Sequence, residues 1–202
     1  LGAGLTSFSN DALKDETRRL PLMNMPEKEE IASTPKASEE KNVPSFAPVV
    51  DSAAHGNALD AATMARARQV FDGLIARGMS PETALGFAAN AVQESRANPA
   101  TNPGDLGASH GLMQWRDDRH AGFVNKFGNS TALDDHLDYI LHELSGPESN
   151  AWKAIQSAGD DPMAKAAAVS QFYERPKDTQ AEIARRSSIA QRLAAQFLQG
   201  GA

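Results

Sequence analysis

The stretch of sequence that decides the fold is "NAVQESRANPATNPGDLGASHGLMQW", residues 90–115. Its first part continues a helical pattern up to Glu94, and its middle consists of Asn, Pro, Gly and Ala residues that favour turns. An apolar Gly-Leu-Met-Gln-Trp segment then follows. Glu94 is therefore expected on the last turn of a helix, where the helix dipole disfavours a negative charge. An acidic residue at that end needs a reason other than capping.

The residues on both sides of this stretch have the periodicity of amphipathic helices. Ser80 followed by Pro81 is typical of a helix start, and Gly78 ends the helix before it. Only residues 97–114 depart from the helical pattern, which predicts a small irregular or hairpin lobe. We therefore expect a mainly α-helical domain over residues 59–202, with predicted helices at 60–79, 80–95, 117–128, 130–146, 147–159, 161–176 and 178–200.

Residues 1–58 have a different composition from the rest of the chain. Five of the 11 prolines lie between residues 21 and 48, among charged residues, Ser and Thr. Such a segment buries too little apolar surface to offset its loss of conformational entropy. We expect an extended linker with one short helix near residues 9–20, ordered only by a partner. The chain begins with Leu1, and we expect it to be a processed or excised piece of a longer protein.

Composition also excludes several classes of function. The net charge is −6, so the chain lacks the basic surface of a nucleic-acid-binding protein. No apolar run approaches the length of a membrane span, and the absence of cysteine excludes disulfides and thiol catalysis. His136, His142 and Glu143 do not have the spacing of a helical zinc site. We therefore expect no metal and no cofactor.

Two carboxylates in the opening stretch suit glycosidic chemistry. A general acid that keeps its proton near neutral pH needs a raised pKa, which burial or the negative end of a helix dipole provides. Glu94 has the second feature by position. Asp105 follows eleven residues later in "PGDLG", where a turn would present its carboxylate. Two carboxylates that flank a cleft are the minimum for a glycosidase, although a solvated helix end would have the same sequence.

Three motifs, in this order along the chain, resemble those of a known protein family with this chemistry. They are "GLIARGMSPETALGFAANAVQESRANP", "GLMQWRDDR" and "FYERP". Together they resemble the phage tail-type lysozyme domain, a relative of goose-type lysozymes and soluble lytic transglycosylases, over roughly residues 62–198. The resemblance implies a lysozyme-like fold, with Glu94 as the catalytic acid and Gln114 in the sugar cleft. The aromatic residue before Glu-Arg-Pro corresponds to Tyr173 or Phe172.

The resemblance also implies a substrate, peptidoglycan glycan strands. Glu94 would protonate the β-1,4 glycosidic oxygen between N-acetylmuramic acid and N-acetylglucosamine. Lysozymes generally use a second carboxylate, for which Asp105 is the candidate, with Asp117 or Asp118 as substitutes. Lytic transglycosylases use one Glu and form a 1,6-anhydro product, so the choice between the two reactions stays open, with hydrolysis favoured.

Four further residues are candidates for binding the sugar. Gln114 either hydrogen-bonds an N-acetyl group or satisfies nearby backbone groups. Trp115 either stacks on a sugar ring or fills the core. Tyr173 either closes the cleft near Glu94 or anchors the end of its helix. His110 is a loop histidine that we include among the residues that contact substrate.

Other residues in the same motifs are expected to have structural roles. We expect Trp152 in the core, and exposed ion pairs that join Arg116 and Arg119 to the aspartates next to them. Glu174 is expected to pair with Arg175 or Arg185.

The resemblance places the protein in a virion, in the tail or as an ejected internal component that acts in the periplasm and cell wall of the host. There it would open the wall locally during infection, and residues 1–58 would attach it to another virion protein. A bacterial secretion apparatus would have use for the same domain. The alternatives are an inactive lysozyme fold that only binds, and a helical interaction domain, which would leave the long Gly/Pro loop unexplained.

Overall fold

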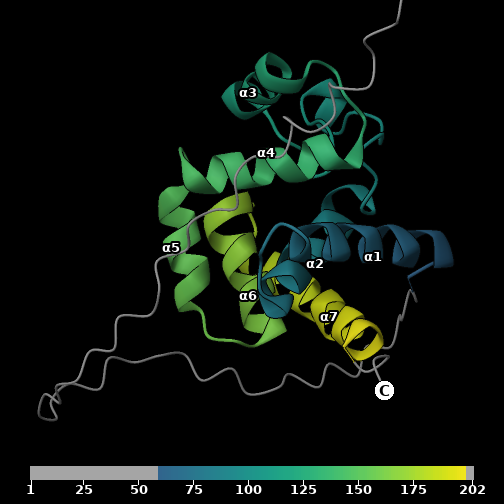
Figure 1. Ribbon diagram of the computed structural model, residues 1–202, viewed down its shortest axis with the longest axis vertical. Helices are drawn as coiled ribbons and strands as arrows, with labels where there is room; N and C mark the ends of the chain where they lie inside the picture. Colours follow the sequence, from purple (N-terminus) through teal and green to yellow (C-terminus); the bar gives the residue numbers. More distant parts are fainter. Residues whose placement is uncertain (1–58, 199–202) are drawn as a thin grey trace, which may run out of the picture.

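The domain is built from helices joined by short connections. The computed structural model describes residues 59–198, except for the side chain of Asp105. The elements in chain order are α1 (Ala61–Ile75), α2 (Pro81–Ser95), the 3-10 turn η1 (Asp105–Gly107), α3 (Asp117–Phe127), α4 (Leu133–Ser145), α5 (Ser149–Ser157), α6 (Pro162–Ala168), the π-helical η2 (Val169–Glu174) and α7 (Thr179–Phe197). In Figure 1, α4 crosses between α3 on one side and α6 and α7 on the other. The structure thus confirms the predicted helices, with ends that differ by a few residues.

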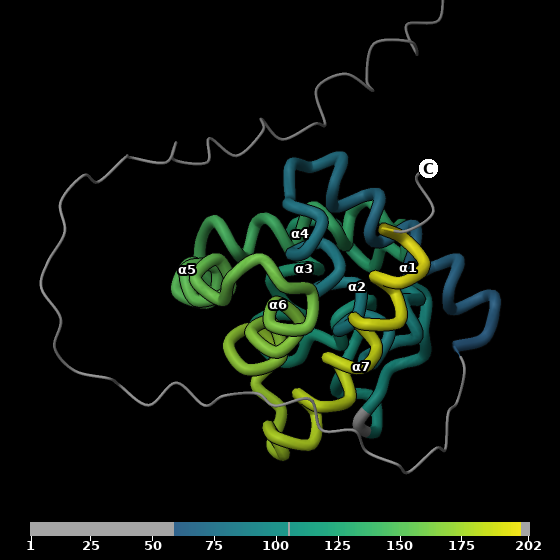
Figure 2. Tube along the Cα trace, turned by 90° about the horizontal axis from the view of Figure 1, so that it is seen from below, coloured from purple at the N-terminus to yellow at the C-terminus, as the bar shows by residue number. Residues whose placement is uncertain are grey.

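Helix α2 is the centre of the domain and packs against α1, α6 and α7 (Figure 2). Ser80 caps it by accepting a hydrogen bond from the backbone N–H of Thr83, and Pro81 is its first residue, as predicted. Most of its residues are buried on all sides, which is typical of a core helix. At Gly86 a Cβ atom would lie 2.9 Å from the carbonyl carbon of Lys165, so glycine is what lets α6 approach this closely. This packing fixes the direction in which the C-terminal end of α2 points.

The predicted helix over 161–176 is divided into two parts. It is α-helical only to Ala168 and continues as the wider π-helix η2, which ends with the backbone N–H of Arg175 donating to the carbonyl oxygen of Ser170 at 2.8 Å. Arg175 then adopts a left-handed backbone with φ of 55°, before Pro176. The wider turn alters which side chains face inward, and Tyr173 becomes fully buried.

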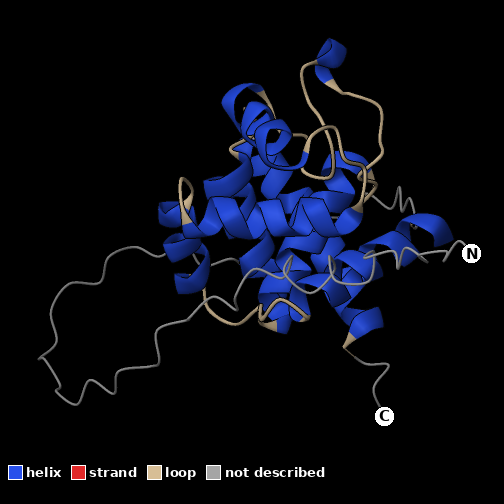
Figure 3. Cartoon of the chain, turned by 45° about the horizontal axis from the view of Figure 1, so that its top comes forward, coloured by secondary structure: helices blue, strands red, loops and turns tan. Residues whose placement is uncertain are grey.

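The lobe predicted for residues 97–114 is present and extends to Arg116, just before α3. Figure 3 shows it as loop with one helical turn. Two isolated antiparallel bridges, Gly104 to Ser109 and His110 to Trp115, replace a regular hairpin, and residues 59–198 contain no β-strand. Left-handed backbone conformations interrupt any extended run at Ala97, Leu106 and Gln114. Of the two predicted forms, an irregular lobe and a hairpin, the chain therefore adopts the irregular lobe.

A cluster of aromatic rings attaches the lobe to α3 and α4. The rings of Trp115 and Phe123 stack with their centroids 5.3 Å apart, and Tyr139 meets Trp115 edge-on at 5.0 Å. The Tyr139 hydroxyl also donates to the carbonyl oxygen of Arg119 at 2.7 Å. Such pairs add to the burial of apolar area and give the lobe a fixed orientation.

The fold class is therefore mainly α, as expected. Residues 1–58 lie outside the described residues, so the extended segment and its short helix stay predictions. Between residues 59 and 198, none of the helices combines the length and the apolar character needed to cross a bilayer.

Candidate active site

Glu94 lies on the last turn of α2, where the helical pattern predicts it. The helix ends at Ser95, and Arg96 follows with a left-handed backbone, φ 54°. The Ser95 hydroxyl donates to the carbonyl oxygen of Leu112 at 2.7 Å, which ties the end of α2 to the lobe. The Glu94 side chain is 20% exposed. The carboxylate is thus held at the junction of helix and lobe and remains accessible to a substrate.

Arg186 on α7 binds Glu94 directly. Its Nη2 lies 2.7 Å from Oε1 of Glu94, and its Nη1 donates to Oδ1 of Asn90, one helical turn earlier, at 2.8 Å. Glu182 accepts a second hydrogen bond from Nη2 at 3.1 Å. The guanidinium side chain is only 4% exposed. Hydrogen bonds between ionised groups are the strong ones, so the last helix of the domain holds Glu94 in place.

Glu174, at the end of η2, is a second carboxyl in this region, and the residue is half-buried. Its Oε1 is buried and has no hydrogen-bond partner among the described residues. The expected pairs with Arg175 and Arg185 do not form, because those arginines bind Glu148 and Glu182 instead. Burial, together with the negative charge of Glu94, raises the pKa of Glu174 to about 8.

Asp105, the predicted second carboxylate, is the first residue of η1 in the lobe. Its side chain lies outside what the structure describes, so its role stays a prediction. Asp117 and Asp118, the two substitutes, are exposed in the first turn of α3.

Gln114 uses its amide group within the lobe. Its Oε1 accepts from the backbone N–H of Gly104 at 3.1 Å, and its Nε2 donates to the carbonyl oxygen of Gly111 at 2.9 Å. The side chain therefore crosses the lobe and joins its two halves. The sequence leaves two roles for Gln114, binding of an N-acetyl group and bonding to nearby backbone groups. The structure has Gln114 in the second role.

Trp115 and Tyr173 lie in the core, with exposed fractions of 1% and 0%. Both donate to the same oxygen, Oε2 of Glu143, the indole from Nε1 at 2.9 Å and the phenol through its hydroxyl. Buried indole and phenol groups need such a partner, and Glu143 provides it. The structure therefore favours the core alternative for both rings, although Trp115 also lines the pocket described below, and a contact of either ring with sugar stays a prediction. Phe172, the alternative aromatic of that motif, is 40% exposed.

Arg119 completes the buried cluster around Glu143. Its Nε and Nη2 bind the two carboxylate oxygens at 2.7 and 2.9 Å, and its Nη1 donates to the carbonyl oxygen of Tyr173 at 3.1 Å. Arg119 therefore does not form the surface pair with neighbouring aspartates that its sequence position suggested. The bidentate pair connects α3 to α4 and, through Tyr173, to η2.

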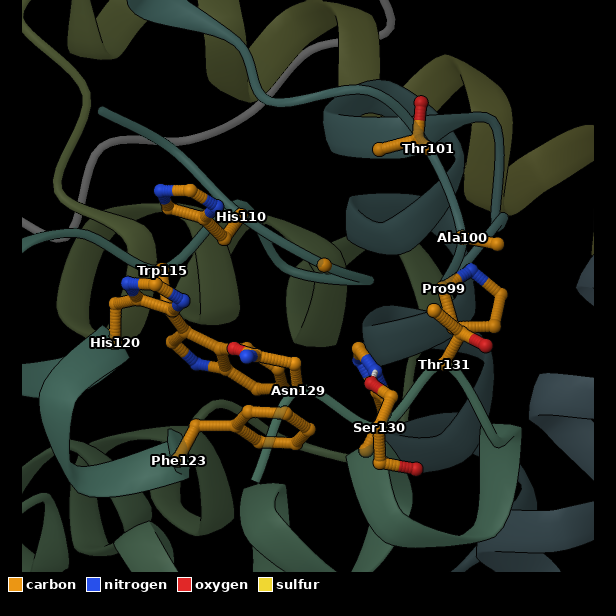
Figure 4. Close-up of a pocket in the computed structure, with 12 residues that line it drawn as sticks. Pro99, Ala100, Thr101, His110, Trp115, His120, Phe123, Asn129, Ser130 and Thr131 are labelled. Atoms are coloured by element: carbon orange, nitrogen blue, oxygen red, sulfur yellow. Dashed lines mark hydrogen bonds between the residues drawn. The ribbon is translucent and has the colours of Figure 1, made fainter. Parts of the chain in front are cut away.

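A pocket of about 140 Å³ opens between the lobe, α3 and the segment before α4. Figure 4 shows the rings of His110, His120, Trp115 and Phe123 along one side of it, opposite Pro99 and Thr131. The His110 and His120 rings stack with centroids 3.7 Å apart. Aromatic rings next to hydroxyl and amide groups are the surface that a sugar or its acetamido group requires.

No group of three or more His, Asp or Glu side chains that could hold a metal ion occurs in residues 59–198. His136 uses both ring nitrogens in the protein, one next to the N–H of Leu112 at 3.1 Å and one next to the carbonyl oxygen of Ser130 at 3.0 Å.

Residues 65–197, more than half of the chain, match the family model of the phage tail lysozyme. The chain belongs to the phage tail lysozyme family. A comparison with curated proteins found no match. Membership makes this a phage-associated, lysozyme-like domain of the class that acts on glycosidic bonds in the cell wall. In this phage tail lysozyme domain, the hydrogen bond from Ser95 to Leu112 joins the residue after Glu94 to the Gly-Leu-Met-Gln-Trp segment of the lobe.

Sequence reasoning missed the surroundings of three charged residues of this phage tail lysozyme domain: Glu143, Glu174 and Arg186. Glu143 was considered only as a poor metal ligand, and Arg186 was not considered. The sequence did contain one indication that Glu143 is buried, because this residue lies on the apolar stripe of a strongly amphipathic helix. A charged residue on such a stripe predicts a buried partner.

Proposed function

We propose that this domain is a muramidase that cleaves the β-1,4 bond between N-acetylmuramic acid and N-acetylglucosamine, with Glu94 as general acid. The observation that carries the proposal is the placement of Glu94. The chain belongs to a family of lysozymes, and its Glu94, the Glu of the Glu-Ser pair, is partly exposed at the end of a buried helix, next to the lobe. A rigid core helix keeps the carboxyl in a constant position relative to the lobe, as general acid catalysis requires.

In the proposed reaction, Glu94 gives its proton to the glycosidic oxygen while an oxocarbenium-like transition state develops. Asp105 is our candidate for the second carboxylate, which would activate a water molecule or stabilise the positive charge. Attack by water gives a reducing muramyl end. Attack by the internal hydroxyl of the muramyl residue gives a 1,6-anhydro end and needs only Glu94.

On this proposal the pocket beside the lobe takes a neighbouring part of the substrate. His110 and Trp115 line it, and Gln114 joins the two halves of the lobe. Tyr173 contributes from inside the core, by holding Glu143 and the end of η2.

We further propose that the domain belongs to a virion and acts on the host wall at entry, with residues 1–58 as its attachment to another virion protein. The family favours this role over a bacterial secretion apparatus. An inactive lysozyme fold that only binds glycan is the second candidate. The Gln114 amide favours that candidate, because its Oε1 and its Nε2 are each already bonded to a backbone group of the lobe.

The test is digestion of purified peptidoglycan by the full chain, with mass spectrometry of the soluble muropeptides. Glu94→Gln is the test variant, and Glu82→Gln, at the opposite end of α2, is the matched control. We expect reducing muramyl ends from the wild type and the control, and a loss of about a hundredfold or more in the test variant.

Each other outcome changes the assignment. 1,6-anhydro ends would make the domain a lytic transglycosylase and remove the need for Asp105. Sedimentation with peptidoglycan but no cleavage by folded wild-type protein would favour the binding module. Full activity of Glu94→Gln would overturn the role of Glu94.

A further inference from the structure

The reaction proposed above gives no role to His136, a histidine of α4 that lies between the lobe and the helices and is only 1% exposed. Leu112 of the lobe directs its backbone N–H at Nδ1 of this ring, at 3.1 Å, and Nε2 lies 3.0 Å from the carbonyl oxygen of Ser130. An N–H donates and a carbonyl oxygen accepts, so Nδ1 must be the bare nitrogen and Nε2 must carry the proton. The two hydrogen bonds therefore form together only in a neutral ring of this one tautomer.

The turn that donates to His136 also holds the end of α2. The carbonyl oxygen of Leu112 accepts the hydroxyl of Ser95 at 2.7 Å, and Ser95 directly follows Glu94 in the sequence. Leu112 is fully buried, so its N–H would be left without an acceptor if the histidine were lost. One residue of the lobe thus connects His136 to the neighbour of the candidate acid.

Gly111 brings the backbone of this turn directly against the ring of His136. Its φ is +71°, and a Cβ atom there would lie 2.5 Å from Cε1 of the ring. The rings of Trp115 and Phe123 also pack on His136, with centroids 5.4 and 4.6 Å away. Backbone and uncharged aromatic rings therefore enclose the imidazole, and a positive charge on it would be poorly solvated.

The titratable groups around the ring act in two directions. Burial lowers the pKa of His136, against the opposing effects of the Ser130 carbonyl group and the Asp135 carboxylate on α4. His110 from the lobe and His120 from α3 line the same pocket, and their rings stack with centroids 3.7 Å apart. Burial and the neighbouring His110 lower the pKa of His120, because two protonated rings at this distance would repel each other. The lobe therefore meets both α3 and α4 through contacts that favour neutral histidines.

We propose that His136 is a positioning residue, which holds the Leu112 turn and the end of α2 beside Glu94 only while its ring is neutral. When Nδ1 takes a proton from solvent, the ring gains one N–H bond and one positive charge. The former acceptor then becomes a second donor that faces the N–H of Leu112, so the turn moves away from α4. The effect on activity rests on the proposed function, whereas the effect on the structure does not.

The first test is NMR of the wild-type chain, labelled with nitrogen-15 in its histidine rings and its backbone. At about pH 7.5 we expect His136 to have a bare Nδ1 and a protonated Nε2. As the pH is lowered, its protonation should coincide with shifts of the amide signals of Leu112 and of Arg96, just after the end of α2. His142, exposed on the same helix, is the control, and its titration should move neither amide signal.

Three results of this test would each overturn the proposal. The first is a proton on Nδ1 of His136 at about pH 7.5. The second is an amide signal of Leu112 or Arg96 that does not move while His136 titrates. The third is a His136 ring that stays neutral until the whole domain unfolds.

The second test is the pH dependence of kcat/KM on peptidoglycan, in two variants that change the ring in different ways. His136→Asn retains an acceptor for the Leu112 N–H but does not titrate, so its activity should fall less steeply than that of the wild type below about pH 6. His136→Phe retains a planar ring without an acceptor, and we expect a loss of about tenfold already at neutral pH. His142→Asn should follow the wild-type profile.

An equal loss in His136→Asn and His136→Phe at every pH would mean that the ring only fills space, and would overturn the positioning role. A wild-type protein with the expected tautomer and titration that cannot cleave peptidoglycan would instead overturn the proposed function. Because the NMR test uses the wild-type chain, its result holds even where a variant does not fold.

Discussion

Arg186 on α7 and Glu94 on α2 are separated by 92 residues of sequence, and Nη2 of the arginine lies 2.7 Å from Oε1 of the glutamate. The arginine also binds Asn90, so it contacts two successive turns of α2. The last helix of the domain therefore positions the candidate catalytic acid.

Replacement of Arg186 should destabilise the fold. Arg186→Met leaves Glu94 and Glu182 without their shared cation, and we expect a loss of about 3 kcal/mol in the free energy of unfolding. This is the lower end of the range for a broken buried pair, because Glu94 is partly solvated. Urea unfolding measures the change. The control is Arg185→Met, since Arg185 is 62% exposed and pairs only at the surface. Equal losses in the two variants would contradict the structure.

The cluster around Glu143 should be the most sensitive to a change of charge. In Glu143→Gln the amide is uncharged, and Arg119, a largely buried cation, loses its bidentate carboxylate partner and keeps only Glu148 at 4.0 Å. We expect a loss of about 3–5 kcal/mol, together with a changed near-ultraviolet circular dichroism signal from Trp115. Asp72→Asn, which removes the exposed pair with Arg68, should cost less than about 1 kcal/mol. A similar loss in both variants would mean that the Glu143 cluster is not buried.

Ionisation of Glu174 should lower the stability of the protein as the pH rises. The pKa of Glu174 is raised from 4.5 to about 8 by burial and by Glu94. Between these values Glu174 is protonated in the folded state and ionised in the unfolded state, so its contribution to the free energy of unfolding decreases with pH until about pH 8 and then levels off. Glu174→Gln should show a shallower decrease. Urea unfolding at about pH 5, 6.5 and 8 compares the two slopes, and equal slopes would refute the prediction.

Two glycines of the lobe should differ in their tolerance of alanine. Gly111 has a φ of +71°, and a Cβ there would lie 2.5 Å from Cε1 of His136. Gly107 has a φ of +96° with nothing within 4 Å. Gly107→Ala should therefore cost only backbone strain, about 1–2 kcal/mol. Gly111→Ala should cost clearly more, because the His136 ring must also move. Thermal melting of both variants measures the difference, and equal melting temperatures would contradict this packing.

The sequence by itself determined the elements and the family. Helical periodicity with Ser80, Pro81 and Gly78 as boundary signals is a local property, so it predicted the helices and the end of α2. The same is true of the irregular lobe, because Pro and Gly residues restrict the backbone wherever the rest of the chain lies. Glu94 was recognisable because its motif is contiguous in sequence.

Only the tertiary structure decided which charges meet. Arg186 lies 92 residues from Glu94, and Glu143 lies 28 residues from Trp115, so no local pattern indicates either contact. The π-helical turn of η2 gave Glu174 and Tyr173 inward positions that α-helical spacing does not predict. The physical reason is that burial and charge act through space. The same Glu174 carboxyl would be an ordinary surface acid if α2, α3, α4 and α7 did not bring Glu94, Arg119, Glu143 and Arg186 around it.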